Sequence, residues 1–169
     1  MPQLLIRKVA VLGAGVMGAQ IAAHLANADV ETILFDLPAK EGKPNGIVDK
    51  AIANLGKLSP APLASKSKVA AITAANYDQH LHLLRDCDLI IEAIAERMDW
   101  KKDLYDKIEN HVAPHAILAS NTSGLSINGL SEVLPESLHS RFCGVHFFNP
   151  PRYMHLAELI PCAKTDREV

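Results

Sequence analysis

A glycine-rich turn constrains the fold of this chain more than any other feature of its sequence. In "KVAVLGAGVMGAQIA" the glycines Gly13, Gly15 and Gly18 have the spacing G-x-G-x-x-G. An apolar strand pattern over residues 8–13 leads into them, and a helical pattern over residues 16–28 follows. The first glycine permits a tight turn, the second lets backbone approach a pyrophosphate, and the third lets helix pack on strand. The motif therefore predicts a dinucleotide at the N-terminus of this helix.

A carboxylate further along indicates which dinucleotide binds. Asp36 ends the next strand pattern, residues 31–36, where a carboxylate accepts hydrogen bonds from the adenosine ribose hydroxyls. It would repel a 2′-phosphate, and no arginine follows it, so NAD is favoured over NADP. Val16 and Met17 belong to the glycine turn, and we expect them to lie beside the cofactor. Because glycine turns are common, a purely structural turn is the alternative interpretation.

Strand and helix patterns alternate along the rest of the chain. Strand patterns cover residues 69–73, 88–94, 116–120, 141–148 and 156–162, and helical patterns cover 77–87, 99–111 and 126–134. This alternation predicts the α/β class, with a Rossmann-type doubly wound, mostly parallel sheet covered on both faces. Residues 37–68 are too long for an ordinary loop and contain a helical pattern between prolines and glycines. We expect them to project as a helical arm.

Composition narrows the class of partner. The 169 residues carry 17 Lys+Arg and 19 Asp+Glu, so the formal net charge of -2 does not favour nucleic acid or an anionic membrane. No apolar stretch is long enough to span a bilayer, and the three scattered cysteines form no C-x-x-C pair. We expect residues 1–169 to be one cytoplasmic domain with reduced thiols, no metal, and a small molecule or protein as its partner.

Four stretches resemble the NAD-binding domain of L-3-hydroxyacyl-CoA dehydrogenases, in the same order and at similar spacing. They are "GAGVMGAQIA", "DLIIEAIAERMDWKKDLY", "ILASNTSGLSI" and "GVHFFNPPRYMHLAEL", and the most specific part is "SNTS" followed by "HFFNP". The resemblance implies NAD-dependent oxidation of L-3-hydroxyacyl-CoA to 3-ketoacyl-CoA in fatty-acid β-oxidation. The run "PPRYMHLAELIP" is most similar to long bacterial members that also contain an enoyl-CoA hydratase module, and the family implies a homodimer.

A histidine and a glutamate inside an apolar stretch form the predicted catalytic pair. Oxidation of a secondary alcohol needs a base beside the hydroxyl group, and imidazole suits that task at neutral pH, so we assign it to His146. Glu158 is the anion that would orient and stabilise the imidazolium. The prolines of "NPP", residues 149–151, force a turn that would bring two successive strands together. The alternative is a structural histidine and a surface carboxylate.

The resemblance assigns roles to further residues. Ser123 matches a serine whose hydroxyl donates to the substrate oxygen, and a helix cap is its alternative role. Glu96 and Lys101 match positions that contact the nicotinamide half of the cofactor, and Asn149 matches one close to the nicotinamide. Lys101 is otherwise a solvated helix lysine. Three lysines of the arm are expected either to contact the phosphates of CoA or only to keep the arm solvated. They are Lys57, Lys66 and Lys68.

Two features of the family have no counterpart in these 169 residues, namely a helical C-terminal domain and a catalytic asparagine. We therefore expect the activity to belong to a longer protein of which this chain is the NAD-binding part. The rival functions are a non-catalytic NAD-binding module and a dehydrogenase of another 3-hydroxy acid. His146 together with Glu158 favours catalysis, because binding NAD requires neither residue.

Overall fold

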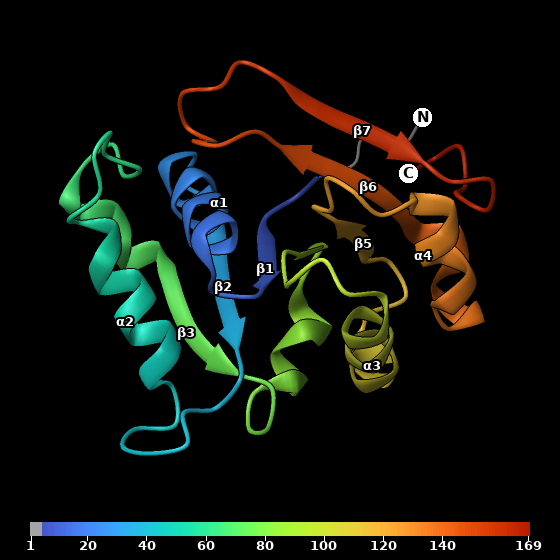
Figure 1. Ribbon diagram of the computed structural model, residues 1–169, viewed down its shortest axis with the longest axis horizontal. Coiled ribbons are helices and arrows are strands. Elements are labelled where there is room, and N and C mark those ends of the chain that lie inside the picture. The colour runs from blue at the N-terminus through green and yellow to red at the C-terminus, as the bar shows by residue number, and fades with distance from the viewer. Residues whose placement is uncertain (1–4) are drawn as a thin grey trace.

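Residues 5–169, which the computed structural model describes, form a seven-stranded sheet with helices on both faces (Figure 1). Its order is β3-β2-β1-β4-β5-β6-β7, and every neighbouring pair is parallel except β6 with β7. The strands are β1 Lys8–Leu12, β2 Glu31–Asp36, β3 Ile72–Asn76, β4 Leu89–Glu92, β5 Ile117–Ser120, β6 Phe142–Phe147 and β7 Ala157–Pro161. The predicted doubly wound, mostly parallel sheet is confirmed.

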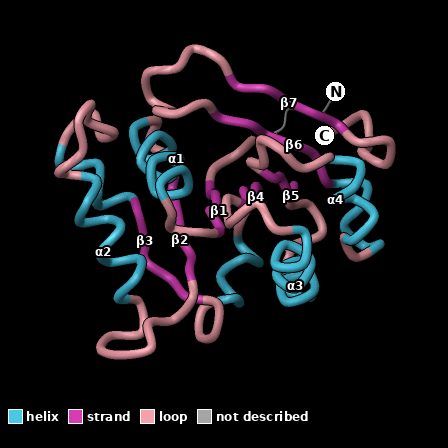
Figure 2. Tube along the Cα trace, in the orientation of Figure 1, coloured by secondary structure: helices cyan, strands magenta, loops and turns pink. Residues whose placement is uncertain are grey.

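Helices cover the two faces of the sheet in separate groups (Figure 2). Because side chains alternate along a strand, Val9 and Val11 of β1 face one core, whereas Ala10 and Leu12 face the other. The first core contains α1 (Val16–Asn27) and α2 (Gly46–Leu55). The second contains α3 (Met98–Ile108) and α4 (Ile127–Val133). Parallel strands buried on both faces explain the near-continuous apolar runs.

The predicted projecting arm is wrong for its helical part. α2 packs against the sheet beside α1 and buries Val48 and Leu55 in their common core. The following loop is also tied down, because Asn27 of α1 donates from Nδ2 to the Pro62 carbonyl at 2.8 Å and accepts from the Ala64 amide at 2.7 Å. The amphipathic pattern predicted the helix correctly, but it carried no information about which neighbour would cover its apolar side.

Two predicted boundaries around β3 are also wrong. The apolar run 69–73 is split, because Val69 lies inside the 3₁₀ helix Lys66–Ala71 and β3 begins only at Ile72. The helix predicted over residues 77–87 is reduced to a turn and the 3₁₀ helix Leu81–Asp86. Asn76 begins the turn, because its side-chain oxygen accepts from the amides of Asp78 and Gln79, at 3.1 and 2.9 Å. The turn does not continue as an α-helix, because the backbone of His80, at φ -121° and ψ 7°, lies outside the helical region.

The last two strands form an antiparallel hairpin, as the prolines predicted. Its register places His146 directly opposite Glu158, and the connection runs through residues 148–156. β6 contributes buried side chains to the core, whereas every residue of β7 is exposed at the edge of the sheet. Among residues 5–169, no helix has the length and apolar character that crossing a membrane requires.

Candidate active site

The glycine turn has the geometry of a phosphate cradle. Gly13 has φ 106°, and a Cβ there would lie 2.8 Å from the Ala93 carbonyl oxygen. A Cβ on Gly18 would lie 1.8 Å from the Gly13 carbonyl oxygen, so the helix approaches the turn as closely as only glycine allows. Gly15 is the N-cap of α1, and a Cβ placed there would meet no atom within 4 Å. The turn therefore leaves space for an anion at the N-terminus of α1, where the helix amides would point at it.

A cavity of about 410 Å³ opens beside this turn. Gly13 and Gly15 line one side, the β4–α3 connection lines another through Ile94, and Tyr77 and Trp100 add aromatic surface. Most of the lining is apolar, which is what a flat heteroaromatic ring requires. A turn that can bind an anion, at one end of an apolar cavity, fits a dinucleotide.

Asp36 lies in the same cavity, at the carboxyl end of β2. Its Oδ2 accepts from the Ala14 amide at 2.6 Å, and its Oδ1 accepts from the Leu37 amide at 2.7 Å. These bonds fix the carboxylate next to the glycine turn. Val16 and Met17, also assigned to the cofactor, form the first turn of α1, where Val16 is 69% exposed.

His146 and Glu158 meet across the β6–β7 hairpin. Nδ1 of His146 lies 2.8 Å from Oε2 of Glu158. The imidazole is mostly buried, with its side chain 17% exposed, and its ring centroid lies 4.5 Å from that of Phe148. The carboxylate is half exposed, at 48%. The two predicted partners are therefore in contact, and Glu158 is at the same time an exposed carboxylate on an edge strand, as the alternative interpretation also predicted.

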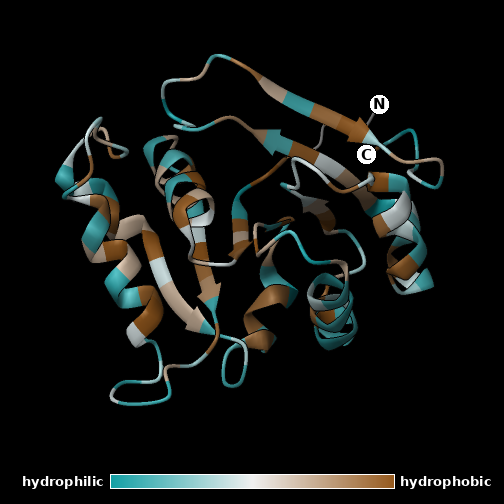
Figure 3. Cartoon of the chain, in the orientation of Figure 1, coloured by the Kyte–Doolittle hydropathy of each residue, from teal (hydrophilic) through white to brown (hydrophobic). Residues whose placement is uncertain are grey.

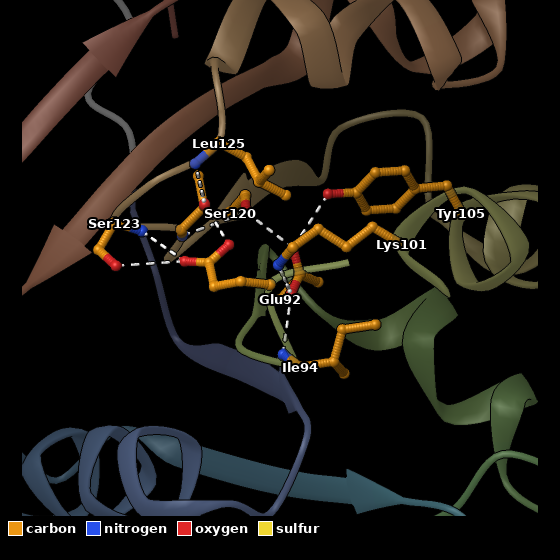
Figure 4. Close-up of polar contacts among 9 residues, drawn as sticks. Glu92, Ile94, Lys101, Tyr105, Ser120, Ser123 and Leu125 are labelled. Atoms are coloured by element: carbon orange, nitrogen blue, oxygen red, sulfur yellow. Dashed lines mark hydrogen bonds and ion pairs between the residues drawn. The ribbon is translucent and has the colours of Figure 1, made fainter. Parts of the chain in front are cut away.

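A second polar cluster holds Ser123 (Figure 4). Glu96, in the β4–α3 connection, accepts from Thr122 Oγ1 at 2.5 Å, from the Ser123 amide at 2.7 Å and from Ser123 Oγ at 3.3 Å. Burial opposes ionisation of Glu96, but these hydrogen bonds and the charge of Lys101 outweigh it, so the pKa of Glu96 is lowered. The helix cap considered for Ser123 belongs to Ser126, whose Oγ accepts from the Gly129 amide.

The Ser123 segment adjoins the strand that carries His146. The Phe147 amide donates to Asn121 Oδ1 at 2.9 Å, and β5 and β6 are parallel neighbours. The Ser123 and His146 segments therefore both lie at the carboxyl ends of the parallel strands, which is where ligands bind in open α/β sheets. Asn149, three residues after the histidine, is exposed and lies beside α1, where its Oδ1 accepts from Gln20 Nε2 at 3.3 Å.

The structure does not place Lys101 on the surface, so the alternative of a solvated helix lysine is wrong, whereas its contact with the nicotinamide half stays a prediction. The side chain is 1% exposed, and its ammonium lies 2.6 Å from Glu92 Oε1. The ammonium is therefore paired inside the domain and is not solvated. Residues 101, 104, 105 and 108 are buried along one side of α3. This i, i+3, i+4, i+7 spacing, together with an acidic residue in the strand "LIIE", was the sequence signal for Glu92 as a partner.

The arm lysines differ in their surroundings. Lys57 and Lys66 are exposed, and the Lys57 ammonium donates to Asn54 Oδ1 at 3.4 Å. Lys68 pairs with the carboxylate of Asp29, next to the C-terminal end of α1. Its charge is therefore already engaged within the chain.

Comparison with known proteins agrees with this geometry. Residues 8–169 match the family model described as the NAD-binding domain of 3-hydroxyacyl-CoA dehydrogenase. A fatty acid oxidation complex trifunctional enzyme of Rickettsia felis is 50% identical over 156 residues, which are 92% of this chain and 22% of that protein. A 3-hydroxyacyl-CoA dehydrogenase of Deinococcus radiodurans is 42% identical over 97% of this chain and 48% of its own length.

A solved structure agrees in fold as well. The 3-hydroxybutyryl-CoA dehydrogenase of Escherichia coli superimposes with a TM-score of 0.80 at 30% identity, over 98% of this chain and 34% of that one. The chain spans between about one fifth and one half of the length of these relatives. It belongs to the family of NAD-binding domains of 3-hydroxyacyl-CoA dehydrogenases.

Proposed function

We propose that the protein containing this chain oxidises L-3-hydroxyacyl-CoA to 3-ketoacyl-CoA with NAD. The observation that carries the proposal is the 2.8 Å contact between His146 and Glu158 at the ligand-binding edge of the sheet. Binding a dinucleotide requires no such pair, whereas removing a proton from an alcohol requires a base and benefits from an anion behind it.

The contact assigns separate tasks to the two nitrogens of the imidazole. With Nδ1 directed at Glu158, Nε2 of His146 is the nitrogen that takes the hydroxyl proton of the substrate. Glu158 stabilises the imidazolium that results and keeps the ring oriented. The chemistry supplied by bound NAD is acceptance of the hydride from the same carbon.

Other residues support substrate and cofactor in this proposal. The Ser123 hydroxyl donates to the substrate oxygen as charge develops on it, and Glu96 holds the serine in place. Gly13, Gly15, Gly18 and Asp36 hold the adenosine diphosphate half of NAD, with Val16 and Met17 beside it. Glu96, Lys101 and Asn149 lie toward the nicotinamide in this proposal. Lys57 and Lys66 meet the CoA phosphates, and Lys68 does so less readily because of Asp29.

The proposal extends to the assembly in which the domain works. A trifunctional enzyme among the relatives supports a longer chain with further modules. We propose that one of these modules is an enoyl-CoA hydratase. We propose a homodimer of that longer protein in the cytoplasm, where the free cysteines Cys87, Cys143 and Cys162 would remain reduced.

Assay of the longer protein with NAD tests the proposal. NADH should form with L-3-hydroxybutyryl-CoA, and the D enantiomer should give a rate lower by at least about a hundredfold, because His146 approaches the hydroxyl from one side. NADH binding measured by calorimetry on the same preparation separates a folded but inactive protein from an unfolded one. Normal NADH binding without oxidation of any L-3-hydroxyacyl-CoA would support the non-catalytic module instead.

A further inference from the structure

A fully buried carboxylate lies at the centre of the sheet edge that carries the proposed site. Glu92 ends β4, has 0% of its surface exposed, and accepts four hydrogen bonds. Oε1 accepts from Lys101 Nζ at 2.6 Å and from the Ile94 amide at 2.8 Å. Oε2 accepts from Ser120 Oγ at 2.7 Å and from Tyr105 Oη at 3.0 Å (Figure 4). Every lone-pair direction of the carboxylate is thus used.

Core stability alone does not explain this arrangement. A buried ion pair loses its hydration on folding, and apolar side chains of similar volume commonly stabilise a core equally well. What the pair provides is fixed geometry, because hydrogen bonds are directional and apolar contacts are not. The four donors come from α3, from the β4–α3 connection and from the end of β5. The network therefore fixes three elements relative to one another.

One branch of the network leads directly to the proposed site. Ser120 Oγ donates to Glu92 and also accepts from the Thr122 amide at 3.3 Å. Thr122 is the residue before Ser123, and its hydroxyl donates to Glu96. The β4 end of the network, through the Ile94 amide, fixes the connection that carries Glu96. Both partners of the Glu96–Ser123 contact are therefore only a few bonds from one buried carboxylate.

We propose that Glu92, paired with Lys101, is a positioning residue that acts through Ser120 to hold Ser123 and Glu96 in register. This inference rests on the proposed function, because it assumes that Ser123 faces the substrate. Glu92 is buried and contacts no substrate itself. Its role concerns turnover, since a misplaced donor weakens stabilisation of the reacting oxygen.

Two variants that each remove one hydrogen bond to the same oxygen test this role. Ser120→Ala removes the bond that leads to the Ser123 segment, whereas Tyr105→Phe removes the bond from α3. In the longer protein, Ser120→Ala should lower kcat by about tenfold to a hundredfold while KM for NAD and for substrate changes by less than about threefold. Tyr105→Phe should leave kcat within about twofold of wild type, even if its unfolding midpoint falls as far as that of Ser120→Ala.

Hydrogen exchange provides a readout that needs no catalysis. Amides of residues 121–125 should exchange faster in Ser120→Ala than in Tyr105→Phe, while those of β1 stay protected in both. Lys101→Met repeats the test from the other end of the network, with Lys102→Met as the control, because Lys102 is exposed on the same helix and pairs with Asp106. If either the serine or the lysine variant fails to fold, the other decides the result.

Unchanged exchange and unchanged kcat in the folded variants would overturn the positioning role. An equal fall of kcat in Ser120→Ala and Tyr105→Phe would overturn it as well, because the effect would then follow stability. If the wild-type protein oxidised no hydroxyacyl-CoA but residues 121–125 lost protection only in the serine and lysine variants, the proposed function would fail and the structural link would stand.

Discussion

We expect single side chains at the carboxyl ends of the strands to determine which nucleotide this domain binds. Asp36 is fixed by the amides of Ala14 and Leu37, so its carboxylate occupies one place at the edge of the cavity. A ribose carrying a 2′-phosphate would bring a second negative charge next to this carboxylate. In a partly enclosed site, the repulsion should weaken binding of such a nucleotide by several-fold to tenfold or more.

We therefore predict that the protein binds NADH at least about tenfold more tightly than NADPH. Asp36→Asn removes the charge but keeps one acceptor oxygen. It should reduce the difference in affinity between NADH and NADPH, mainly by strengthening NADPH binding. Calorimetric titration of both nucleotides with both proteins measures this. A wild-type protein without preference would show that Asp36 serves only to fix the glycine turn.

Glu96 makes a second residue-scale prediction, this time about pH. Its pKa is lowered in the folded state, since hydrogen bonds from Thr122 and Ser123 outweigh the effect of burial. A carboxyl group with a lowered folded pKa stabilises the fold above its unfolded pKa, near 4.3, and this contribution is lost as pH falls through the folded value. Glu96→Gln should therefore lower the urea midpoint at neutral pH, and the difference from wild type should shrink at about pH 3. An equally large difference at both pH values would contradict the prediction.

At the scale of elements, the turn between β1 and α1 separates a folding role from a binding role. A methyl group on Gly18 would overlap the Gly13 carbonyl oxygen at 1.8 Å, whereas one on Gly15 would point into open space. We predict that Gly18→Ala lowers the unfolding midpoint strongly, while Gly15→Ala leaves it nearly unchanged and weakens NADH binding by at least about tenfold. Thermal unfolding and calorimetry on the two variants measure both effects. Tight NADH binding by Gly15→Ala would show that the phosphates lie elsewhere.

The elements that the sequence predicted well are those with local signals. β1, α1 and β2 follow from apolar runs around a glycine turn, and the β6–β7 hairpin follows from the prolines that interrupt it. The helix predicted over residues 77–87 is wrong because the turn that Asn76 begins ends at His80, where a φ of -121° interrupts the helical backbone. The prediction that the arm projects was wrong for its helix, because an amphipathic pattern does not specify which surface the helix will cover.

The burial of Lys101 in α3 is another feature that local sequence patterns did not predict. The helix has mostly hydrophilic residues (Figure 3), which agrees with the alternative of a solvated Lys101. Its burial follows from Glu92, a residue on a different element, whose charge makes an interior position favourable for an ammonium. Of the candidate site, the glycines, Asp36 and the His146–Glu158 pair were predictable from motifs, whereas the buried network required tertiary contacts.

At the scale of the whole molecule, the described residues contain a cofactor cavity and a histidine–glutamate pair at one edge of one sheet. The chain covers 22% of one relative and 48% of another, so in those proteins this domain is joined to more than its own length of further chain. β7, which carries Glu158, is exposed along its whole length at the edge of the sheet. The catalytic proposal therefore has to be tested in the longer protein, where we expect the second wall of the substrate site.

The most direct test is the effect of Glu158→Gln on turnover of L-3-hydroxybutyryl-CoA by that protein. The change keeps the size of the side chain but removes the charge opposite His146, so kcat should fall by at least about a hundredfold, as it does when a triad carboxylate becomes an amide. Glu132→Gln is the matched control, because Glu132 is an exposed carboxylate that pairs with Lys164 at 3.0 Å. We predict normal NADH affinity in both variants and normal kcat only in the control. A Glu158→Gln enzyme with wild-type kcat would contradict the assignment of His146 and Glu158 as the catalytic pair.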